Sequence, residues 1–331
     1  MAFHLFGNIL TNYSAAANNR GENEGNITTL QKLLWHGDIH TTISAEAIRW
    51  ALRYYWQTAE IDDEVNRTWN DSTNENDWED KSFNPERFID DDVLGYMDAK
   101  KAKEDESDIP DEEVSETQPK GKGKGRKAKS PAPKGSATVR RGVLEVNRAV
   151  SLIPYSGDLT FNAASIGATS GASKGRSPAP YATELHATRY QYCFAMTPAR
   201  LINRQRTIAV LEGLTSLSQV GGNHSRFLYD FSPDSIVLRW THDFAARFFY
   251  CFQENDGAIS MPDLVRRVRV GDIDPQELWI AGSIVDSEEM ADEIEELTQL
   301  GVNTFGGVMA GVSDLIRQIQ IDLKLRELAN A

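Results

Sequence analysis

The sequence has few cysteines and no long apolar run, and each shortage excludes a class of protein. Cys193 and Cys251 are the only cysteines among 331 residues, too few for a disulfide framework or a cysteine-based zinc site. No run of 18 or more apolar residues occurs, so no segment is expected to cross a membrane. The stretch from Met1 to Gly7 lacks the charged start and the cleavage site of a signal peptide. These absences predict a cytoplasmic protein.

The net charge of −14 argues against a partner rich in phosphates, but this charge is unevenly distributed. Residues 60–116 hold 22 acidic and 6 basic side chains, whereas residues 117–141 hold 9 basic and no acidic ones. The rest of the chain has 27 acidic and 20 basic residues, and 7 of those acids lie between Asp286 and Glu296. Outside these stretches the chain is close to neutral, so local patches decide what it binds.

Composition divides the chain into a folded part and an insertion. Residues 1–58 and 140–331 carry the periodic apolar patterns of strands and helices. Residues 59–97 are an acidic insertion, in which isolated aromatic residues predict partial order. Residues 98–139 include the lysine- and glycine-rich run from Lys120 to Lys134, which predicts disorder because it has too little apolar surface to bury.

The periodic patterns predict strands and helices intermixed around a sheet, which is an α+β fold. Strands are expected over residues 3–11, 143–153, 189–196, 236–252 and 278–285, and a loop over 156–180. Helices are expected to begin near Ser44 and to span 199–218 and 288–300, and a last helix follows the apolar stripe from Val312 to Leu323. In the strand over 189–196, the alternating residues Tyr190, Tyr192, Phe194 and Met196 predict a buried face.

Enzyme motifs are few and lack the surroundings that their chemistry needs. Residues 171–175 match the nucleophile elbow G-x-S-x-G, but loop residues flank the motif where a strand and a helix are required, so a flexible loop is favoured over a serine hydrolase. His36 and His40 have a zinc-binding spacing if they are helical, but Gly37 weakens a helix and no third ligand is evident, so loop or partner-facing histidines are favoured. No Walker A motif and no spaced carboxylate triad occurs. The sequence therefore predicts no enzyme, no metal and no cofactor.

Two loops carry side chains that suit single-stranded nucleic acid. Residues 18–26 combine glycine and asparagine with Arg20, so the backbone can approach a ligand closely and a guanidinium can fork onto phosphate. Residues 221–226 repeat this pattern with a glycine pair, small polar donors and Arg226. On composition alone, a surface turn is favoured for the first loop, and a hairpin-like turn is the alternative for the second.

The helix after Ser44 carries two arginines next to aromatic residues. Arg49 and Arg53 share one face, and Trp50 and Tyr54 lie beside them, which fits a surface that holds unpaired bases by charge and stacking. A core helix with a solvated arginine face explains the same residues equally well.

Taken together, these segments resemble the DevR-type backbone subunit of type I-B Cascade, the CRISPR surveillance complex. The resemblance covers about residues 1–58 and 140–330, and it says little about the insertion between them. It rests on the stretches Leu5–Thr11, Ala15–Asn26, Thr28–Lys32, His40–Arg49, Pro180–Arg189 and Gly221–Arg226. Residues 43–49 are the most specific of these, because a serine before a helix with a following basic residue recurs in such subunits.

The resemblance implies a modified RRM-like or ferredoxin-like palm with inserted finger and thumb regions. Copies of the chain would stack head to tail along a guide crRNA and hold its sugar–phosphate backbone, so that the bases pair with target DNA, alongside other Cascade subunits. The RNA contacts implied are Asn19, Arg20, Lys32, Ser44, Arg49 and Arg53, with Arg189, Gly222, His224 and Arg226 as C-terminal candidates.

The same resemblance leaves one enzymatic alternative open. Related backbone subunits of type III complexes cut RNA with a single aspartate, and Asp38 is the residue that keeps this possibility alive. A metal-dependent RNase of the same architecture is therefore the second hypothesis, whereas the first expects no catalytic residue. The acidic-then-basic insertion departs from the compact pattern of the family, so the contacts of the finger region are not predicted.

Overall fold

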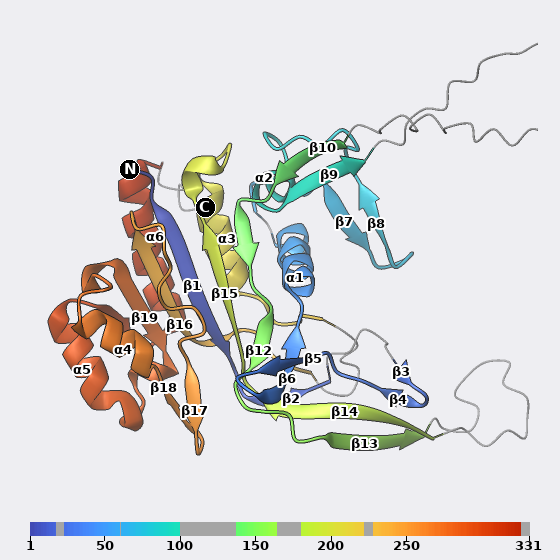
Figure 1. Ribbon diagram of the computed structural model, residues 1–331. Coiled ribbons are helices and arrows are strands. Elements are labelled where there is room, and N and C mark those ends of the chain that lie inside the picture. The colour runs from blue at the N-terminus through green and yellow to red at the C-terminus, as the bar shows by residue number, and fades with distance from the viewer. Residues whose placement is uncertain (18–22, 60, 100–136, 164–179, 222–227, 326–331) are drawn as a thin grey trace, which may run out of the picture.

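The computed structural model describes residues 1–17, 23–59, 61–99, 137–163, 180–221 and 228–325 (Figure 1). A nine-stranded sheet lies at its centre, and every strand pair in it is antiparallel except β19 with β20. Eight strands follow the order β20 (Asn303–Phe305), β19 (Leu278–Gly282), β16 (Pro233–Thr241), β1 (His4–Thr11), β15 (Tyr190–Met196), β12 (Ala149–Ser151), β6 (Asp38–Ile43) and β5 (Lys32–Trp35), and β11 (Leu144–Val146) also pairs with β15.

Helices cover both faces of this sheet. The core on one face lies under α1 (Ala45–Thr58), α3 (Arg206–Thr215) and α6 (Val308–Leu323), and the core on the other lies under α4 (Pro262–Arg269) and α5 (Ala291–Leu300). Four 3-10 turns lie at Pro198–Arg200, Pro275–Glu277, Ser283–Val285 and Glu288–Met290. The intermixed strands and helices confirm the predicted α+β class. No helix in the described ranges is long and apolar enough to span a bilayer.

Strand β1 is central because its residues are buried on both faces. Leu5 and Ile9 belong to the core under α1, α3 and α6, whereas Phe6 and Leu10 belong to the core under α4 and α5. A Cβ atom at Gly7 would lie 2.1 Å from the ring of Phe194 on the neighbouring strand, so only glycine allows the two strands to pack this closely. The predicted central strand is confirmed.

Strand β15 has an apolar face and a face with a small polar cluster. The apolar face was predicted correctly and lies in the first core: Tyr190, Tyr192, Phe194 and Met196. On the other face, the Cys193 thiol donates to Asn8 Oδ1 at 3.0 Å, and the backbone N–H of Tyr250 donates to the same oxygen at 2.6 Å. Burial raises the pKa of both Cys193 and Cys251, so both thiols stay protonated.

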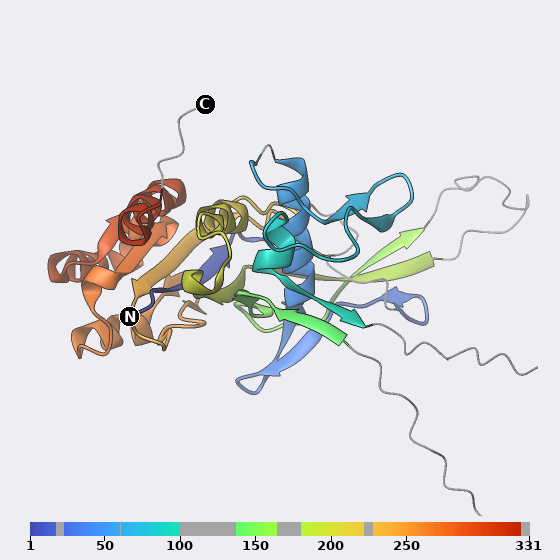
Figure 2. The same cartoon turned by 90° about the horizontal axis from the view of Figure 1, so that it is seen from above.

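A second sheet projects from the first as an arm, at the opposite end of the molecule from the C-terminal helices (Figures 1 and 2). Its order is β13 (Asp158–Ala163), β14 (Pro180–Thr188), β4 (Ile27–Thr28) and β3 (Asn23–Glu24), and β2 (Ser14–Ala16) also pairs with β14. The predicted loop over 156–180 is therefore wrong at residues 158–163. The exposed residues Leu159 and Phe161 alternate with polar ones there, and this was the available strand signal.

The inserted segment folds beside the C-terminal half of α1 (Figure 1). It forms the hairpin of β7 (Arg67–Asn70) with β8 (Glu75–Trp78), the short helix α2 (Ile89–Val93), and β9 (Gly95–Ala99), which pairs with β10 (Ala137–Arg141). Predicted disorder over 98–139 is wrong at both ends, because Ala99 pairs with Ala137. Residues 100–136 lie outside the described ranges.

Other boundaries differ from the predicted ones in the C-terminal half. The predicted helix over 199–218 begins only at Arg206, and the strand expected from residue 236 ends at Thr241. A further hairpin, β17 (Gln253–Asn255) with β18 (Ala258–Ser260), was not predicted. The acidic helix and the last amphipathic helix are confirmed, and Val312, Leu315 and Ile319 are buried as expected.

Asp92 of α2 is a fully buried carboxylate that joins the insertion to the core. It accepts the backbone N–H groups of Ile202 at 3.0 Å and Asn203 at 3.2 Å. It also pairs with Arg206 of α3 at 3.0 Å and with Arg140 of β10. Charge-assisted bonds of this kind offset the cost of removing a carboxylate from water.

The other two acids of α2 hold the insertion to α1 and to itself. Asp90 lies 3.1 Å from Nε of Arg53 and accepts the backbone N–H of Asn66 at 2.8 Å. The carboxylate of Asp91 accepts the side-chain amide of Asn66 and the backbone N–H of Asn84, both at 2.9 Å. Burial raises the pKa of Asp91.

A buried polar network lies where the arm joins the central sheet. Thr41 Oγ1 is 2.7 Å from Nδ1 of His186 and 2.8 Å from the hydroxyl of Tyr190. The second ring nitrogen of His186 is buried, and no residue in the described ranges meets hydrogen-bond geometry with it. Burial, reinforced by the neighbouring His40, lowers the pKa of His186 to about 4.

Replacing Asp92 with asparagine removes one of the two carboxylates that balance Arg206, whose side chain is 1 % exposed; the other is Asp63, 2.8 Å from Nε of Arg206. We expect Asp92→Asn to lower the free energy of unfolding by about 3–5 kcal/mol, measured by chemical denaturation. Asp77→Asn, at an exposed site of the same insertion, is the matched control and should change it by less than about 0.5 kcal/mol. Equal stabilities of the two variants would contradict the anchoring role of Asp92.

The low pKa of His186 predicts a loss of stability in acid. The unfolded chain binds a proton below about pH 6.5, whereas the folded chain excludes it down to about pH 4, so stability falls as the pH drops through this window. In His186→Gln the difference between denaturation midpoints at pH 7 and pH 5 should be smaller than in the natural chain. His242→Gln, at an exposed histidine, should keep the full difference. Identical pH dependence in all three proteins would refute this role of His186.

Candidate nucleic-acid interface

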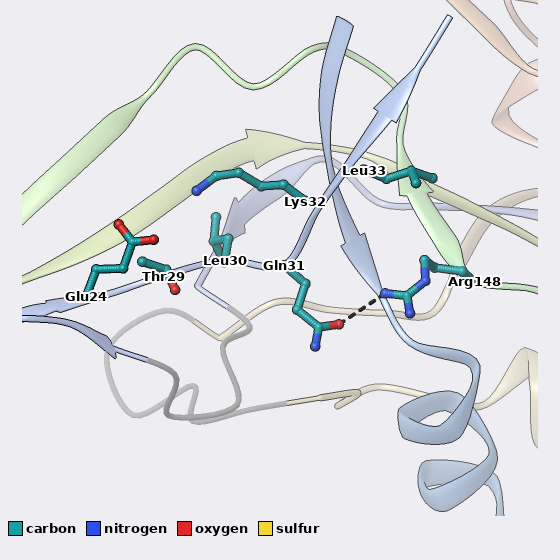
Figure 3. A pocket seen from close by; sticks show the side chains of 7 residues that line it. All are labelled: Glu24, Thr29, Leu30, Gln31, Lys32, Leu33 and Arg148. Atoms are coloured by element: carbon teal, nitrogen blue, oxygen red, sulfur yellow. Dashed lines mark hydrogen bonds between the residues drawn. The ribbon is translucent and has the colours of Figure 1, made fainter.

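A pocket of about 550 Å³ opens between the arm and the edge of the central sheet (Figure 3). Its lining comes from β3, from the segment that joins β4 to β5, from the start of β5 and from the residue before β12: Glu24, Thr29, Leu30, Gln31, Lys32, Leu33 and Arg148. Two cations, one carboxylate and several polar groups thus face one cavity, an arrangement that suits a sugar-like ligand with an anionic group.

Lys32, a predicted RNA contact, lies in this pocket, but its charge is already balanced. Its Nζ is 2.6 Å from both carboxylate oxygens of Glu184 in β14, and 5.0 Å from the centre of the Tyr155 ring. Glu184 also accepts the backbone N–H of Leu30 at 2.7 Å. Burial and the charge of Glu184 raise the pKa of Tyr155 to about 12, so the phenol stays neutral. Lys32 therefore adds little net charge to the pocket.

Arg148 is the cation of this pocket that is held by neutral groups. Its Nη1 donates to the side-chain oxygens of Gln31 and Thr42, both at 3.1 Å, and Figure 3 shows Gln31 and Arg148 turned toward one another. The side chain is exposed, and it forms no ion pair with any residue that the structure describes. An oriented guanidinium without a carboxylate partner is suited to bind phosphate.

Arg148 is absent from the predicted contacts because residues 143–153 were expected to form one strand. The chain instead leaves the sheet between β11 and β12, at Asn147 and Arg148. Two polar residues in an otherwise apolar run were the available signal of this break.

Ser44 caps α1, as its position in the sequence predicts. Its side-chain oxygen accepts the backbone N–H of Ala47 at 3.2 Å, and its own backbone is extended. The helix thus begins where it was expected, and a contact between Ser44 and RNA stays a prediction.

Arg49 and Arg53 contact the insertion. Arg49 donates to the backbone oxygen of Leu94 at 2.7 Å, and Arg53 pairs with Asp90. The Arg53 side chain is 11 % exposed, and burial together with the charge of Arg67 lowers its pKa to about 10. Both guanidinium groups have a structural role that the sequence did not predict, and their contact with RNA stays a prediction. Arg53 in particular presents almost no surface to a ligand.

Arg189 lies apart from the pocket, at the junction of β14 and β15. Its Nη1 is 3.8 Å from the carboxylate of Asp234, and its guanidinium lies 6.0 Å from the centre of the Tyr13 ring. Arg189 and Lys32 are therefore not brought together in one site, although both belong to the base of the arm.

The remaining predicted contacts lie outside the described residues: Asn19, Arg20, Gly222, His224 and Arg226. The structure does describe the residues that flank the two gaps in which these contacts lie. Glu24, two residues after the first gap, lines the pocket. Gly221 lies beside the start of α1, since a Cβ there would be in ordinary contact, at 3.4 Å, with Ala47 of α1 and with Ile43 of β6. The first gap thus ends at the pocket edge, and the second begins beside α1.

The residues considered for metal binding lie in or next to the turn between β5 and β6. His36 is exposed in this turn, whereas His40 is buried with Nδ1 2.7 Å from the backbone oxygen of Ser151, so the helical spacing that a shared zinc ion needs does not form. Asp38 is exposed beside His36. In the described ranges, no group of three or more His, Cys, Asp or Glu side chains is placed to hold a metal ion. Residues 171–175, with the G-x-S-x-G match, lie outside those ranges.

Comparison with known proteins adds independent information about this chain. No model of a known protein family matches it. A protein of Myxococcus xanthus (strain DK1622), described as "CRISPR-associated protein Cas7/Cst2/DevR", is 42 % identical over 334 residues, which span 98 % of this chain and 100 % of that protein.

Two solved structures share the fold at low sequence identity. One, described as "CRISPR RNA-guided surveillance complex", aligns with a TM-score of 0.52 and 15 % identity, over 96 % of this chain and 99 % of the other. The second, "CRISPR RNA-guided surveillance complex, pre-nicking", aligns with a TM-score of 0.54 and 14 % identity, over 96 % and 100 %. At these identities the likeness shows the fold alone.

Proposed function

The chain belongs to the Cas7/Cst2/DevR family of CRISPR-associated proteins, and we propose that it is the crRNA-binding backbone subunit of an RNA-guided surveillance complex. The observation that carries this function is the 42 % identity over 98 % of the chain, because a relationship that spans both proteins leaves no large part of the fold unaccounted for. The fold shared with two surveillance-complex chains supports the same function.

In this function the chain holds the sugar–phosphate backbone of the guide and leaves its bases to pair with target DNA. The pocket around Arg148 supports such a contact, because a guanidinium fixed by Gln31 and Thr42 can bind phosphate without reading a base. Thr42 lies just before α1, so the phosphate contact would lie at the start of the helix that Ser44 caps.

We also propose a finer arrangement, which the same family membership supports. The central sheet serves as the RRM-like palm, the β13–β14 arm as the thumb, and the insertion after α1 as the fingers. Further copies of the chain assemble head to tail along the guide in the cytoplasm, with other subunits of a type I-B Cascade as partners. A near-neutral palm suits this task, since the guide needs local contacts rather than a uniformly basic surface.

We further propose that the chain does not cleave RNA. A nuclease of the same architecture would depend on Asp38, which is the exposed first residue of β6. Two-metal hydrolysis needs several carboxylates around the ions, and the described residues place Asp38 in no such group.

Arg148→Ala should weaken binding of single-stranded RNA about tenfold, and equally for every guide sequence. The slope of log affinity against log salt should fall by about 0.7, because one phosphate contact is lost. Lys32→Ala should have a smaller effect, since Glu184 already balances its charge. Titrations at several salt concentrations measure both quantities.

The matched control is Arg317→Ala, which removes one positive charge from an exposed arginine of α6 that pairs with Asp314. If Arg148→Ala loses no more affinity for RNA than Arg317→Ala does, the phosphate contact is excluded. A chain that carries no RNA after co-expression with a guide array would contradict the function itself.

Incubation of the RNA-loaded complex with complementary RNA and Mg²⁺ should leave that RNA intact on a denaturing gel. Cut products that disappear in Asp38→Ala would establish the nuclease alternative. Cut products that persist in Asp38→Ala would point to a contaminating enzyme and leave the proposal in place.

A further inference from the structure

A second pocket, of about 340 Å³, lies on the aromatic face of α1. Its lining residues come from α1, from the turn after β7 and from the segment after α3: Trp50, Ala51, Tyr54, Tyr55, Thr58, Asp71, Ser216, Leu217, Ser218 and Gln219. Ala51 and Leu217 are buried, the three aromatic side chains are half-buried, and the residues with hydroxyl, amide or carboxylate groups are exposed. The pocket therefore has an apolar floor, aromatic walls and a polar rim.

The aromatic wall is held in place by the insertion. Trp50 and Tyr54 stack with their ring centres 5.3 Å apart and their planes 8° apart, and Trp69 of β7 meets Trp50 edge-on at 5.6 Å. The side chain of Gln57 accepts the backbone N–H of Trp69 at 2.7 Å and donates to its backbone oxygen at 2.8 Å. These contacts orient the rings before any ligand arrives, which lowers the entropy cost of binding.

The charges around this pocket disfavour phosphate. None of the ten lining residues is lysine or arginine, because Arg49 and Arg53 are turned to the insertion. The only charged residue is Asp71, and the C-terminal end of α3 adds partial negative charge from its last carbonyl groups. The pocket thus suits a neutral planar ring whose edge carries hydrogen-bond donors.

The first pocket lies beside the start of α1, and the second lies on the helix itself. The first reaches Thr42 through Arg148, and the second begins at Trp50, on the order of 10 Å further along the helix axis. The lining segment Ser216–Gln219 leads to Gly221, beside Ala47, where the glycine- and arginine-containing stretch of the sequence begins. A single strand fixed by phosphate at Arg148 would therefore have its neighbouring nucleotides within reach of the second pocket.

We propose that this second pocket binds an unpaired base of the guide RNA, an inference that rests on the RNA-binding function proposed above. The base lies against the rings of Trp50 and Tyr54, and the N–H groups at its edge, which every base carries, donate to acceptors at the rim. Because every base has an aromatic face, stacking accepts any guide sequence, as a backbone subunit requires.

The test uses the full chain and short single-stranded RNAs that carry 2-aminopurine at successive positions, since its fluorescence falls when the base stacks on an aromatic ring. One position should be quenched on binding to the natural chain. Tyr54→Leu should abolish this quenching and weaken binding about 5- to 100-fold, whereas Tyr54→Phe keeps the ring and should retain both. The salt dependence should not change in Tyr54→Leu, because no phosphate contact is removed.

Phe244→Leu is the control, because this ring is 86 % exposed in the loop after β16 and lines no part of the pocket. If RNA binding depends on Arg148, but no position is quenched and Tyr54→Leu has no effect, the base site is overturned and the proposed function stands. Failure to bind any RNA would remove both. Weaker self-association of RNA-free Tyr54→Leu, with unchanged RNA affinity, would assign the pocket to a side chain of a neighbouring copy and overturn the inference.

Discussion

The buried ionic cluster of α2 is the interaction on which the arrangement of the other parts depends. Asp90 and Asp92 are almost fully buried, and their partners Arg53 and Arg206 belong to α1 and α3, two of the three helices that cover the first core. Removing such charges from water is costly, so the cluster is favourable only while every group has its partner. An alternative position of the insertion would leave charges buried and unpaired. We infer that the cluster acts mainly by excluding such positions.

This constraint fixes the surroundings of α1. Arg49 and Arg53 are held by the insertion, and the aromatic residues that directly follow them line a pocket on the adjoining face of the helix. The same insertion supplies Trp69, which orients that aromatic wall. An acidic segment that looks unsuited to nucleic acid therefore shapes an aromatic pocket, while the phosphate contact that we propose at Arg148 lies outside the insertion.

The sequence predicts best the elements whose environment follows from their own pattern. Strands β1 and β15, the capped start of α1 and the stripe of α6 all bury residues at regular spacing, and the structure has them where they were expected. Long-range pairing leaves no such local pattern. Asp92 has the same chemistry as the exposed acids around it, and only the approach of Arg206, far along the chain, makes it a buried anchor. The roles of Arg49 and Arg53 were missed for the same reason, since their partners belong to a segment without apolar periodicity.

The two buried cysteines have a practical consequence for the chemistry of the whole chain. The Cys193 thiol donates a hydrogen bond to Asn8. Burial keeps both thiols protonated, and a protonated thiol is a poor nucleophile. The two thiols of the natural chain are therefore nearly unreactive toward maleimides and mild oxidants. A single cysteine introduced on the surface, at the rim of either pocket or on the arm, would react alone. Fluorophores, spin labels and crosslinkers can thus be attached at chosen sites without first removing the native thiols.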